Sequence, residues 1–313
     1  MYYSYLRGKQ YELLAIRNSI QKISESNIIP IIEPVKESSR NLLTCVQALK
    51  DVKSNYIIIA NPKCGELVRN QVQAENIIES VIECDPEVEI GLIIDDGSTL
   101  SQIILLVDRF PNQRFSFIHY GRFTAVSELL NYLSKTPRFS RHIFIESTNS
   151  NSYRSSFLGY HRVLIRDGFN RREPNAEYIN HLTEFYSDLY SNYQDLGYQG
   201  FGDFSITGDH FSEGGGQAVT AVIHITYDDN EDINIKHFLS NPRRVADDVS
   251  ILIEEAFSGL EGFLRNKPEV LEWSDSCKSM MEIYQSAGSK TNLANIKKYS
   301  ISHHFELMHR LLR

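Results

Sequence analysis

Short runs of isoleucine, valine and phenylalanine recur along the first two thirds of this sequence, and most are followed by a segment with helical spacing. Runs that stay apolar without alternating are typical of strands buried on both faces, as in a parallel sheet covered by helices. The pattern therefore predicts consecutive βαβ units. The runs lie at 28–35, 56–61, 90–97, 115–121, 142–146 and 162–167.

The helical spacing follows these runs closely, at 41–49, 75–83, 103–110 and 125–133, and it predicts a long helix at 175–196. Ser98 or Thr99 is a suitable N-cap for the helix that begins near Ile103.

The last third of the pattern is less regular. A seventh strand is expected at 201–206 and an eighth at 218–227, but a glycine-rich loop, not a helix, separates them. The eighth strand turns back at 228–231 into 233–238, which predicts a hairpin. Helices are expected at 243–264, behind Pro242, and in two segments joined around 287–289.

Eight candidate strands favour a closed (β/α)8, TIM-like barrel over an open doubly wound sheet. The open sheet usually has fewer strands and a glycine fingerprint in its first βα turn, and no G-x-G-x-x-G follows any of these runs. A barrel also uses about this much chain for one core. We therefore expect a barrel with an irregular last third over residues 1–267, and a helical extension over 268–313 that packs on it as a cap.

The composition restricts the classes of partner and compartment. A net charge of −8 argues against a protein that coats nucleic acid or an anionic membrane. The cysteines form no C-x-x-C pair and no dense framework, which favours reduced thiols. No signal peptide or membrane-spanning run is evident, so we expect a cytoplasmic protein that binds no membrane. Any site for a polyanion must be local.

Two stretches carry a resemblance to a known family. The opening stretch, Tyr5 to Ala15, reads YLRGKQYELLA, and Ile29 to Pro34 follows it. Together they resemble the start of the "beta family" proteins of bacteria and phages, and more closely a related uncharacterised bacterial group that begins L-R-G-K-Q-x-E-L. The segments 202–205 and 222–227 are similar to a later G-D-Y and I-R-Y-T pattern, with His224 where the family often has Arg. The resemblance implies a barrel-like fold and a phage or mobile-element setting, including phage defence. It assigns no catalytic residue.

The working residues of such a barrel lie at the C-terminal ends of its strands. The predicted strand ends are polar here: Glu33, Asn61, Asp95, Asp96, His119, Tyr120, Glu146, Arg166, Asp167, Asp209 and His210. Any one of these carboxylates has an alternative structural role as an N-cap or ion-pair partner. As a set, Glu33, Asp95, His119 and Glu146 suggest acid–base chemistry at one mouth. Glu33, Asp95 and Glu146 are also oxygen ligands that suit magnesium or manganese.

A local excess of arginine surrounds the fifth and sixth predicted strands in this acidic chain. It is either a solvated face with acidic partners or an anion site. Arg166 ends a strand, and its guanidinium could grip a phosphate or carboxylate. The backbone of Gly214 and Gly215 could bind the same anion. Lys9 joins the site if its segment folds over the mouth.

We therefore hypothesise a metal-assisted hydrolase that acts on a small phosphorylated or otherwise anionic substrate. Its catalytic residues would be Glu33, Asp95, His119 and Glu146. Lys9, Arg166, Gly214 and Gly215 would bind the substrate, and Mg²⁺ or Mn²⁺ would be the cofactor. The alternative is a non-catalytic barrel that recognises a phage component or a protein encoded nearby. An open, deep mouth would favour the enzyme, and a plugged mouth would favour recognition.

Overall fold

The chain folds into two compact units, described here from a computed structural model. The structure describes residues 1–213, 219–241, 243, 248–286 and 291–313. The first unit contains Met1–Lys9, Asn27–Asp167 and Leu189–Phe204. The second contains Gln10–Ser26, Gly168–Asp188 and Ser205–Arg313.

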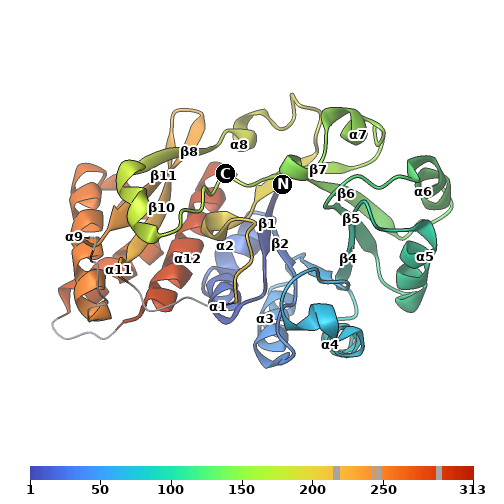
Figure 1. Cartoon of the computed structure of the whole chain (residues 1–313), viewed down its shortest axis with the longest axis horizontal. Helices are drawn as coiled ribbons and strands as arrows, with labels where there is room; N and C mark the ends of the chain where they lie inside the picture. Colours follow the sequence, from blue (N-terminus) through green and yellow to red (C-terminus); the bar gives the residue numbers. More distant parts are fainter. Residues whose placement is uncertain (214–218, 242, 244–247, 287–290) are drawn as a thin grey trace. The chain divides into compact units, whose positions relative to one another are not determined.

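The first unit is a closed barrel of eight parallel strands, so the predicted TIM-like fold is confirmed. Figure 1 shows the strands in a ring. The eighth strand pairs with both the seventh and the first, which closes the barrel. In barrel order the strands are β1 (Tyr2–Leu6), β2 (Ile28–Ile32), β3 (Ile57–Ile59), β4 (Glu89–Ile94), β5 (Phe115–His119), β6 (Phe139–Ile145), β7 (Arg162–Arg166) and β9 (Gly200–Asp203).

The number of strands was predicted correctly, but one barrel strand was missed and one predicted strand lies outside the barrel. The first barrel strand is β1. The sequence pattern does not predict it, because its YYSYL sequence lacks the Ile and Val of the other runs. The predicted eighth strand at 218–227 is not in the barrel: β10 (Val222–Asp229) belongs to a separate antiparallel sheet. The predicted seventh strand, β9, takes the eighth place.

The barrel interior is filled mainly by isoleucine. Side chains alternate along each strand, so Tyr3 and Tyr5 of β1 face inward together with residues such as Ile31 and Ile118. Two glycines make room for these chains. A Cβ on Gly202 would lie 2.0 Å from the Tyr3 carbonyl oxygen, and one on Gly91 would lie 2.6 Å from an Ile59 methyl group. The interior is therefore a packed core and not a channel.

Helices of the first unit follow the barrel strands and lie outside the ring (Figure 1). Thr99 caps α5 as predicted, and it forms a capping box with Gln102. The helices are α3 (Arg40–Asp51), η1 (Glu66–Arg69), α4 (Gln71–Cys84), α5 (Leu100–Arg109), α6 (Val126–Leu133), η2 (Glu146–Thr148), α7 (Asn151–Ser155) and α8 (Leu189–Asn192).

The second unit is built on a three-stranded antiparallel sheet in the order β10, β11 (Asp232–Leu239) and β8 (Thr183–Ser187). The predicted hairpin is confirmed, and Asn230 occupies its turn with a φ of 59°. The predicted helix at 175–196 is wrong. That stretch forms η3 (Asn175–Asn180), β8 and α8, because the β8 residues pair with β11 and this tertiary pairing overrides the helical spacing.

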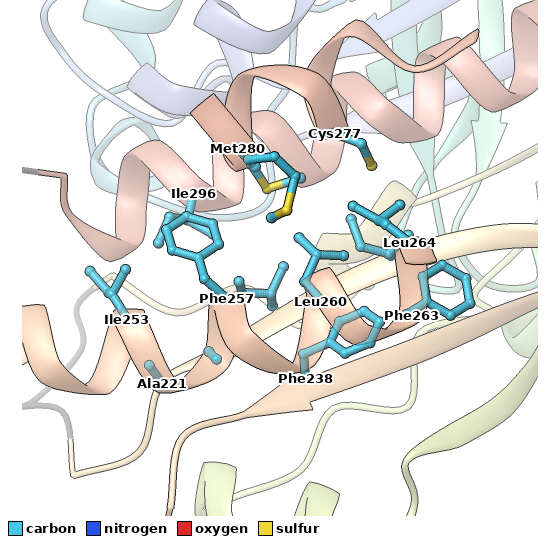
Figure 2. Close-up of a cluster of buried hydrophobic side chains, with 14 of the residues drawn as sticks. Ala221, Phe238, Ile253, Phe257, Leu260, Phe263, Leu264, Cys277, Met280 and Ile296 are labelled. Atoms are coloured by element: carbon cyan, nitrogen blue, oxygen red, sulfur yellow. The ribbon is translucent and has the colours of Figure 1, made fainter. Parts of the chain in front are cut away.

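Helices complete the second unit, and the expected C-terminal helices are present. The apolar face of α9 packs against β10, β11 and α11, where Phe257 and Leu260 meet Met280 (Figure 2). These helices share a core with β10 and β11. Residue 267, where the barrel was predicted to end, therefore lies within the second unit, which includes Ser205–Arg313. The helices are α1 (Gln10–Asn18), α2 (Ile20–Glu25), η4 (Ser205–Thr207), α9 (Val249–Asn266), α10 (Glu269–Trp273), α11 (Asp275–Gln285) and α12 (Leu293–Leu311).

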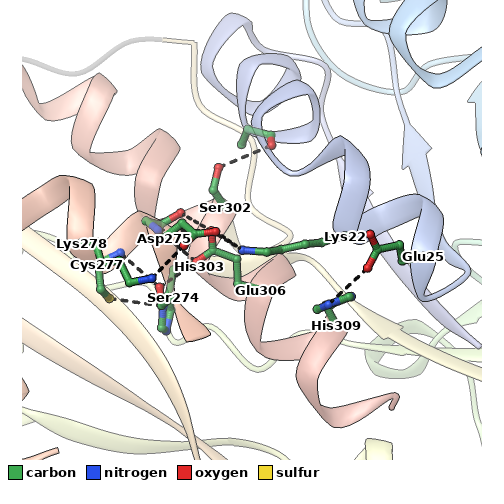
Figure 3. A network of polar contacts seen from close by, with 12 residues as sticks. Lys22, Glu25, Ser274, Asp275, Cys277, Lys278, Ser302, His303, Glu306 and His309 are labelled. Carbon is green, nitrogen blue, oxygen red and sulfur yellow. Dashed lines mark hydrogen bonds and ion pairs between the residues drawn. The ribbon is translucent and has the colours of Figure 1, made fainter. Parts of the chain in front are cut away.

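A buried polar network holds α12 within this unit (Figure 3). Glu306 accepts hydrogen bonds from the Ser274 and Ser276 hydroxyl groups at 2.7 and 2.9 Å. His303 Nε2 donates to the Thr226 carbonyl oxygen at 2.6 Å, and burial lowers the pKa of this histidine to about 4. Because each group has a partner, the network stabilises the core at little desolvation cost.

None of the helices described in the structure has both the length and the apolar character needed to cross a bilayer.

Candidate functional site

The candidate site lies where the barrel strands end at their carboxyl termini. At these strand ends, a side chain two positions after an interior residue faces inward. These side chains are Arg7 after β1, Glu33 after β2, Asn61 after β3 and Asp95 after β4. We call Tyr5, Arg7, Glu33 and Cys64 the mouth cluster.

Glu33 is the centre of the mouth cluster and is fully buried. Its backbone N–H donates to the Leu6 carbonyl oxygen at 2.9 Å, which extends the pairing of β1 and β2 beyond the strands. Its Oε2 accepts hydrogen bonds from the Tyr5 hydroxyl at 2.8 Å and from Arg7 Nη1. Its Oε1 accepts one from the Lys63 backbone N–H at 2.6 Å. Both carboxylate oxygens are therefore engaged.

Arg7 closes the barrel interior from the mouth side. Its guanidinium carbon lies 4.8 Å from the centre of the Tyr5 ring and 5.5 Å from that of Phe204, and the residue is only 7% exposed. Although burial lowers the pKa of Arg7, the adjacent Tyr5 and Glu33 raise it, and the net change is upward. The cation is thus permanently present on the floor of the mouth.

Cys64 and Lys9 lie beside this floor and are partly exposed. Burial and the charge of Glu33 raise the pKa of the Cys64 thiol to about 12, against opposing effects of Arg7 and Lys9. Burial and Glu33 also raise the pKa of Tyr5 well above its ordinary value. Both groups are therefore protonated at neutral pH and can act as hydrogen-bond donors, not as nucleophiles.

Lys63 and Asp95 form the edge of the mouth next to β3 and β4. Lys63 Nζ lies 2.9 Å from Asp95 Oδ2, and both side chains are partly exposed. Although partial burial raises the pKa of Asp95, hydrogen bonds from Lys63 and Ser98 hold it below its ordinary value. Both residues also line a pocket of about 520 Å³ outside β4. The carboxylate is therefore ionised at neutral pH.

The structure places Glu146 and Arg166 together but away from the interior. Ile165 of β7 faces the barrel core, so Arg166, the next residue on that strand, faces outward, and Glu146, the first residue of η2, pairs with it there. Arg166 grips Glu146 with two hydrogen bonds, Nε to Oε2 at 2.6 Å and Nη2 to Oε1 at 3.1 Å. The guanidinium predicted to bind substrate and the carboxylate predicted to act in catalysis therefore form an ion pair with each other.

His119 is not at the mouth, contrary to the prediction. Ile118 faces the interior, so His119 faces the helical layer, where it is fully buried against Phe144 and Phe157. Its ring nitrogens lie 2.8 Å from the Tyr153 hydroxyl and 2.8 Å from His142 Nδ1. Burial lowers the pKa of His119 to about 3. The residue is a neutral core histidine, and solvent does not reach it to exchange protons.

The three carboxylates predicted to bind a metal each have a cationic partner: Arg7 for Glu33, Lys63 for Asp95 and Arg166 for Glu146. Within the described ranges, no three His, Cys, Asp or Glu side chains lie close enough together to hold a metal ion. Binding of Mg²⁺ or Mn²⁺ stays a prediction that this arrangement does not favour. Gly214 and Gly215 lie outside the described residues.

Comparisons with known proteins add little to this geometry. No protein-family model and no curated protein matches the chain. Among solved structures, dihydrodipicolinate synthase from the commensal bacterium Bacteroides thetaiotaomicron is similar with a TM-score of 0.42 and 6% sequence identity, over 64% of this chain and 69% of that one. The assignment of the barrel rests on the strand pairing itself.

Sequence reasoning missed Tyr5, Arg7, Lys63 and Cys64. Tyr5 and Arg7 showed no clear alternation, because Tyr2 and Leu6, on the other face of YYSYLR, are also large and buried. Lys63 and Cys64 come from the irregular loop after β3, and no periodicity marks their approach to Glu33.

Proposed function

We propose that the barrel mouth binds a small anionic molecule that carries a phosphate or carboxylate group. The observation that carries this proposal is the grouping of three cationic side chains at the β1–β4 side of the mouth. Arg7 contacts Glu33, the Lys63 ammonium contacts Asp95, and Lys9 lies near enough to Cys64 to lower the pKa of its thiol. The proposal keeps the anionic ligand expected from sequence but moves it from Arg166 to the β1–β4 side.

The three cations have different tasks in this proposal. Arg7 is committed to Glu33 and nearly buried, so it supplies a fixed positive field and does not contact the ligand. Lys9 and Lys63 are partly exposed and can donate to an anion directly. The Cys64 thiol stays protonated and offers a further donor. Glu33 holds Arg7, Tyr5 and the backbone of Lys63 in place, and is therefore a positioning residue.

Binding is tested by isothermal titration calorimetry with inorganic phosphate and pyrophosphate at low salt. We expect Lys9→Ala and Lys63→Ala each to weaken binding several-fold, and added salt to weaken it further. Lys135→Ala is the matched control, because Lys135 is exposed and precedes β6, at the opposite end of the barrel. Failure of both anions to bind, or an equal effect of Lys135→Ala, would reject the proposal.

Hydrolysis of the bound ligand is the reaction that we propose for this mouth, with Asp95 as its most accessible carboxylate. Water would attack the phosphorus and displace the alcohol, and the ionised Asp95 carboxylate would orient that water by accepting a hydrogen bond from it. A panel of phosphate esters, assayed for released phosphate with and without Mg²⁺ or Mn²⁺, tests the reaction. We expect release that Asp95→Asn abolishes. Binding without any release would favour the non-catalytic recognition barrel, which the filled floor of the mouth also supports.

A further inference from the structure

The pocket outside β4 has a mixed polar and apolar lining. Its accessible apolar surface comes mainly from Leu105 and Leu106 of α5, and behind them lie the buried Leu92, Ile94 and Ile103. Gln71, at the first position of α4, lies at the other side. A volume of about 520 Å³ is within the range of small-molecule sites, which is roughly 300–1,000 Å³.

Leucine side chains at this pocket remain accessible. Leu105 is 71% exposed although it belongs to an amphipathic helix whose Ile103 and Val107 are buried. A single exposed leucine is ordinary. Here, however, Leu105 stands beside the half-buried Leu106, and both line the same hollow. The pocket therefore offers apolar surface that a ligand can cover.

The polar groups around the pocket are mostly satisfied by the protein itself. Asn61 exchanges two 2.8 Å hydrogen bonds with the backbone of Ile93. Gln102 accepts a hydrogen bond from the Thr99 backbone in the capping box, and Ser98 donates to Asp95 at 2.8 Å. A ligand gains little from these groups. The charged side chains that remain to orient it are Lys63 and Asp95.

Lys63 connects the pocket to the mouth. Its backbone N–H donates to Glu33 Oε1 in the mouth cluster, whereas its side chain lines the pocket. The same ammonium group can therefore bind the charged end of a molecule whose apolar part lies over β4. Asp95 opposes a second negative charge at this position, which favours a head group of low charge over a polyphosphate.

We propose that the ligand is an amphipathic anion, with its phosphate or carboxylate at Lys63 and an aliphatic chain in the pocket over β4. This inference rests on the proposed function and specifies its ligand class. It predicts that affinity increases with chain length, because each buried methylene contributes about fourfold in affinity.

The experiment compares monoethyl phosphate with mono-octyl phosphate, which share one head group, by calorimetry below the micelle concentration. The octyl ester has six more methylenes than the ethyl ester, and we expect it to bind at least about 60-fold more tightly, which corresponds to burial of half of them at about fourfold each. Leu105→Gln and Leu106→Gln should remove most of that advantage and leave ethyl phosphate unaffected. Leu158→Gln is the matched control, because Leu158 is also exposed, at 65%, and lies after α7, outside the pocket. Lys63→Ala should weaken both esters alike.

The outcomes separate the two proposals. If ethyl phosphate binds in a manner that depends on Lys63 but the octyl ester binds no more tightly, the amphipathic ligand is rejected and the anion site stands. The same holds if Leu158→Gln acts as strongly as Leu105→Gln. If neither ester binds, both proposals fail. If the octyl ester binds without any dependence on Lys63, the pocket takes apolar molecules independently of the mouth, and both proposals fail as stated.

Discussion

The two sides of the barrel end use similar residues in opposite ways. On the β1–β4 side, Glu33 and Arg7 face inward, and their ion pair is buried on the floor of the mouth. On the β5–β7 side, Glu146 and Arg166 face outward and form a partly exposed ion pair. Both are carboxylate–guanidinium ion pairs, and they differ in the direction in which their side chains point at the strand ends. Position in a strand therefore decides whether a charged residue belongs to the mouth.

The comparison predicts the largest effect for the buried pair. Glu33→Ala leaves the Arg7 guanidinium buried without its carboxylate, so we expect the free energy of unfolding to fall by about 3–5 kcal/mol. Urea denaturation followed by circular dichroism measures this loss.

A second variant distinguishes the buried charge from lost packing. In the double variant Arg7→Met/Glu33→Ala no charge is stranded, so it should be more stable than Glu33→Ala alone. A double variant that is less stable than Glu33→Ala would mean that Arg7 contributes mainly through its stacking on Tyr5 and Phe204.

The buried histidine on the β5–β7 side predicts an effect of intermediate size. Burial lowers the pKa of His119 to about 3, while the unfolded chain keeps a value of about 6.5. Between these values the unfolded state binds a proton that the folded state does not, so the free energy of unfolding falls as the pH falls. The slope for one residue is about 1.4 kcal/mol per pH unit, or about 2 kcal/mol between pH 6.5 and pH 5.

His119→Gln tests this slope, because glutamine keeps hydrogen-bonding capacity and does not titrate. Urea denaturation at pH 7 and pH 5 should show that the variant loses about 2 kcal/mol less than the wild type. The exposed His210, replaced in the same way, serves as the control. If His119→Gln loses as much free energy of unfolding between pH 7 and pH 5 as the wild type, another buried histidine, such as His142, causes the loss.

The outward pair predicts the smallest effect. Arg166 and Glu146 are partly exposed, so we expect each alanine substitution to lower the free energy of unfolding by about 1 kcal/mol or less. The double variant should lose no more free energy of unfolding than either single variant, and a double-mutant cycle measures this. Phosphate binding should not change in Arg166→Ala. Loss of that binding would instead return the anion site to Arg166, where the sequence placed it.

The fold was largely predictable because buried parallel strands leave long apolar runs. The errors lie where strand pairing is decided by contacts distant in sequence. In YYSYL, aromatic residues take the place of isoleucine, so β1 was missed. The segment of β10 has strand-like residues, but it pairs with β11 through a short turn, which closes a smaller loop than joining the barrel would.

The site was predictable in part, since Glu33 lies on the floor of the mouth and Asp95 and Lys9 lie beside it, while His119, Glu146 and Arg166 do not face it. Selecting the last residue of each apolar run ignores which face that residue occupies. In FSFIH nearly every residue is apolar because both faces are buried, so the sequence gives no alternation from which to tell that His119 points outward. The loop residue Cys64 shows no pattern at all.

Pairing of β1 with both β2 and β9 affects how the barrel forms during synthesis. Tyr2 pairs with Ile28 early, but its other partner, Phe201, leaves the ribosome much later. At about 5–20 residues per second, the growing sheet waits on the order of 10–40 s with two open edges, at β1 and at β7. An unpaired edge can recruit strands from other chains. Nascent chains that stall before β9 should therefore be the most prone to aggregate or to require a chaperone.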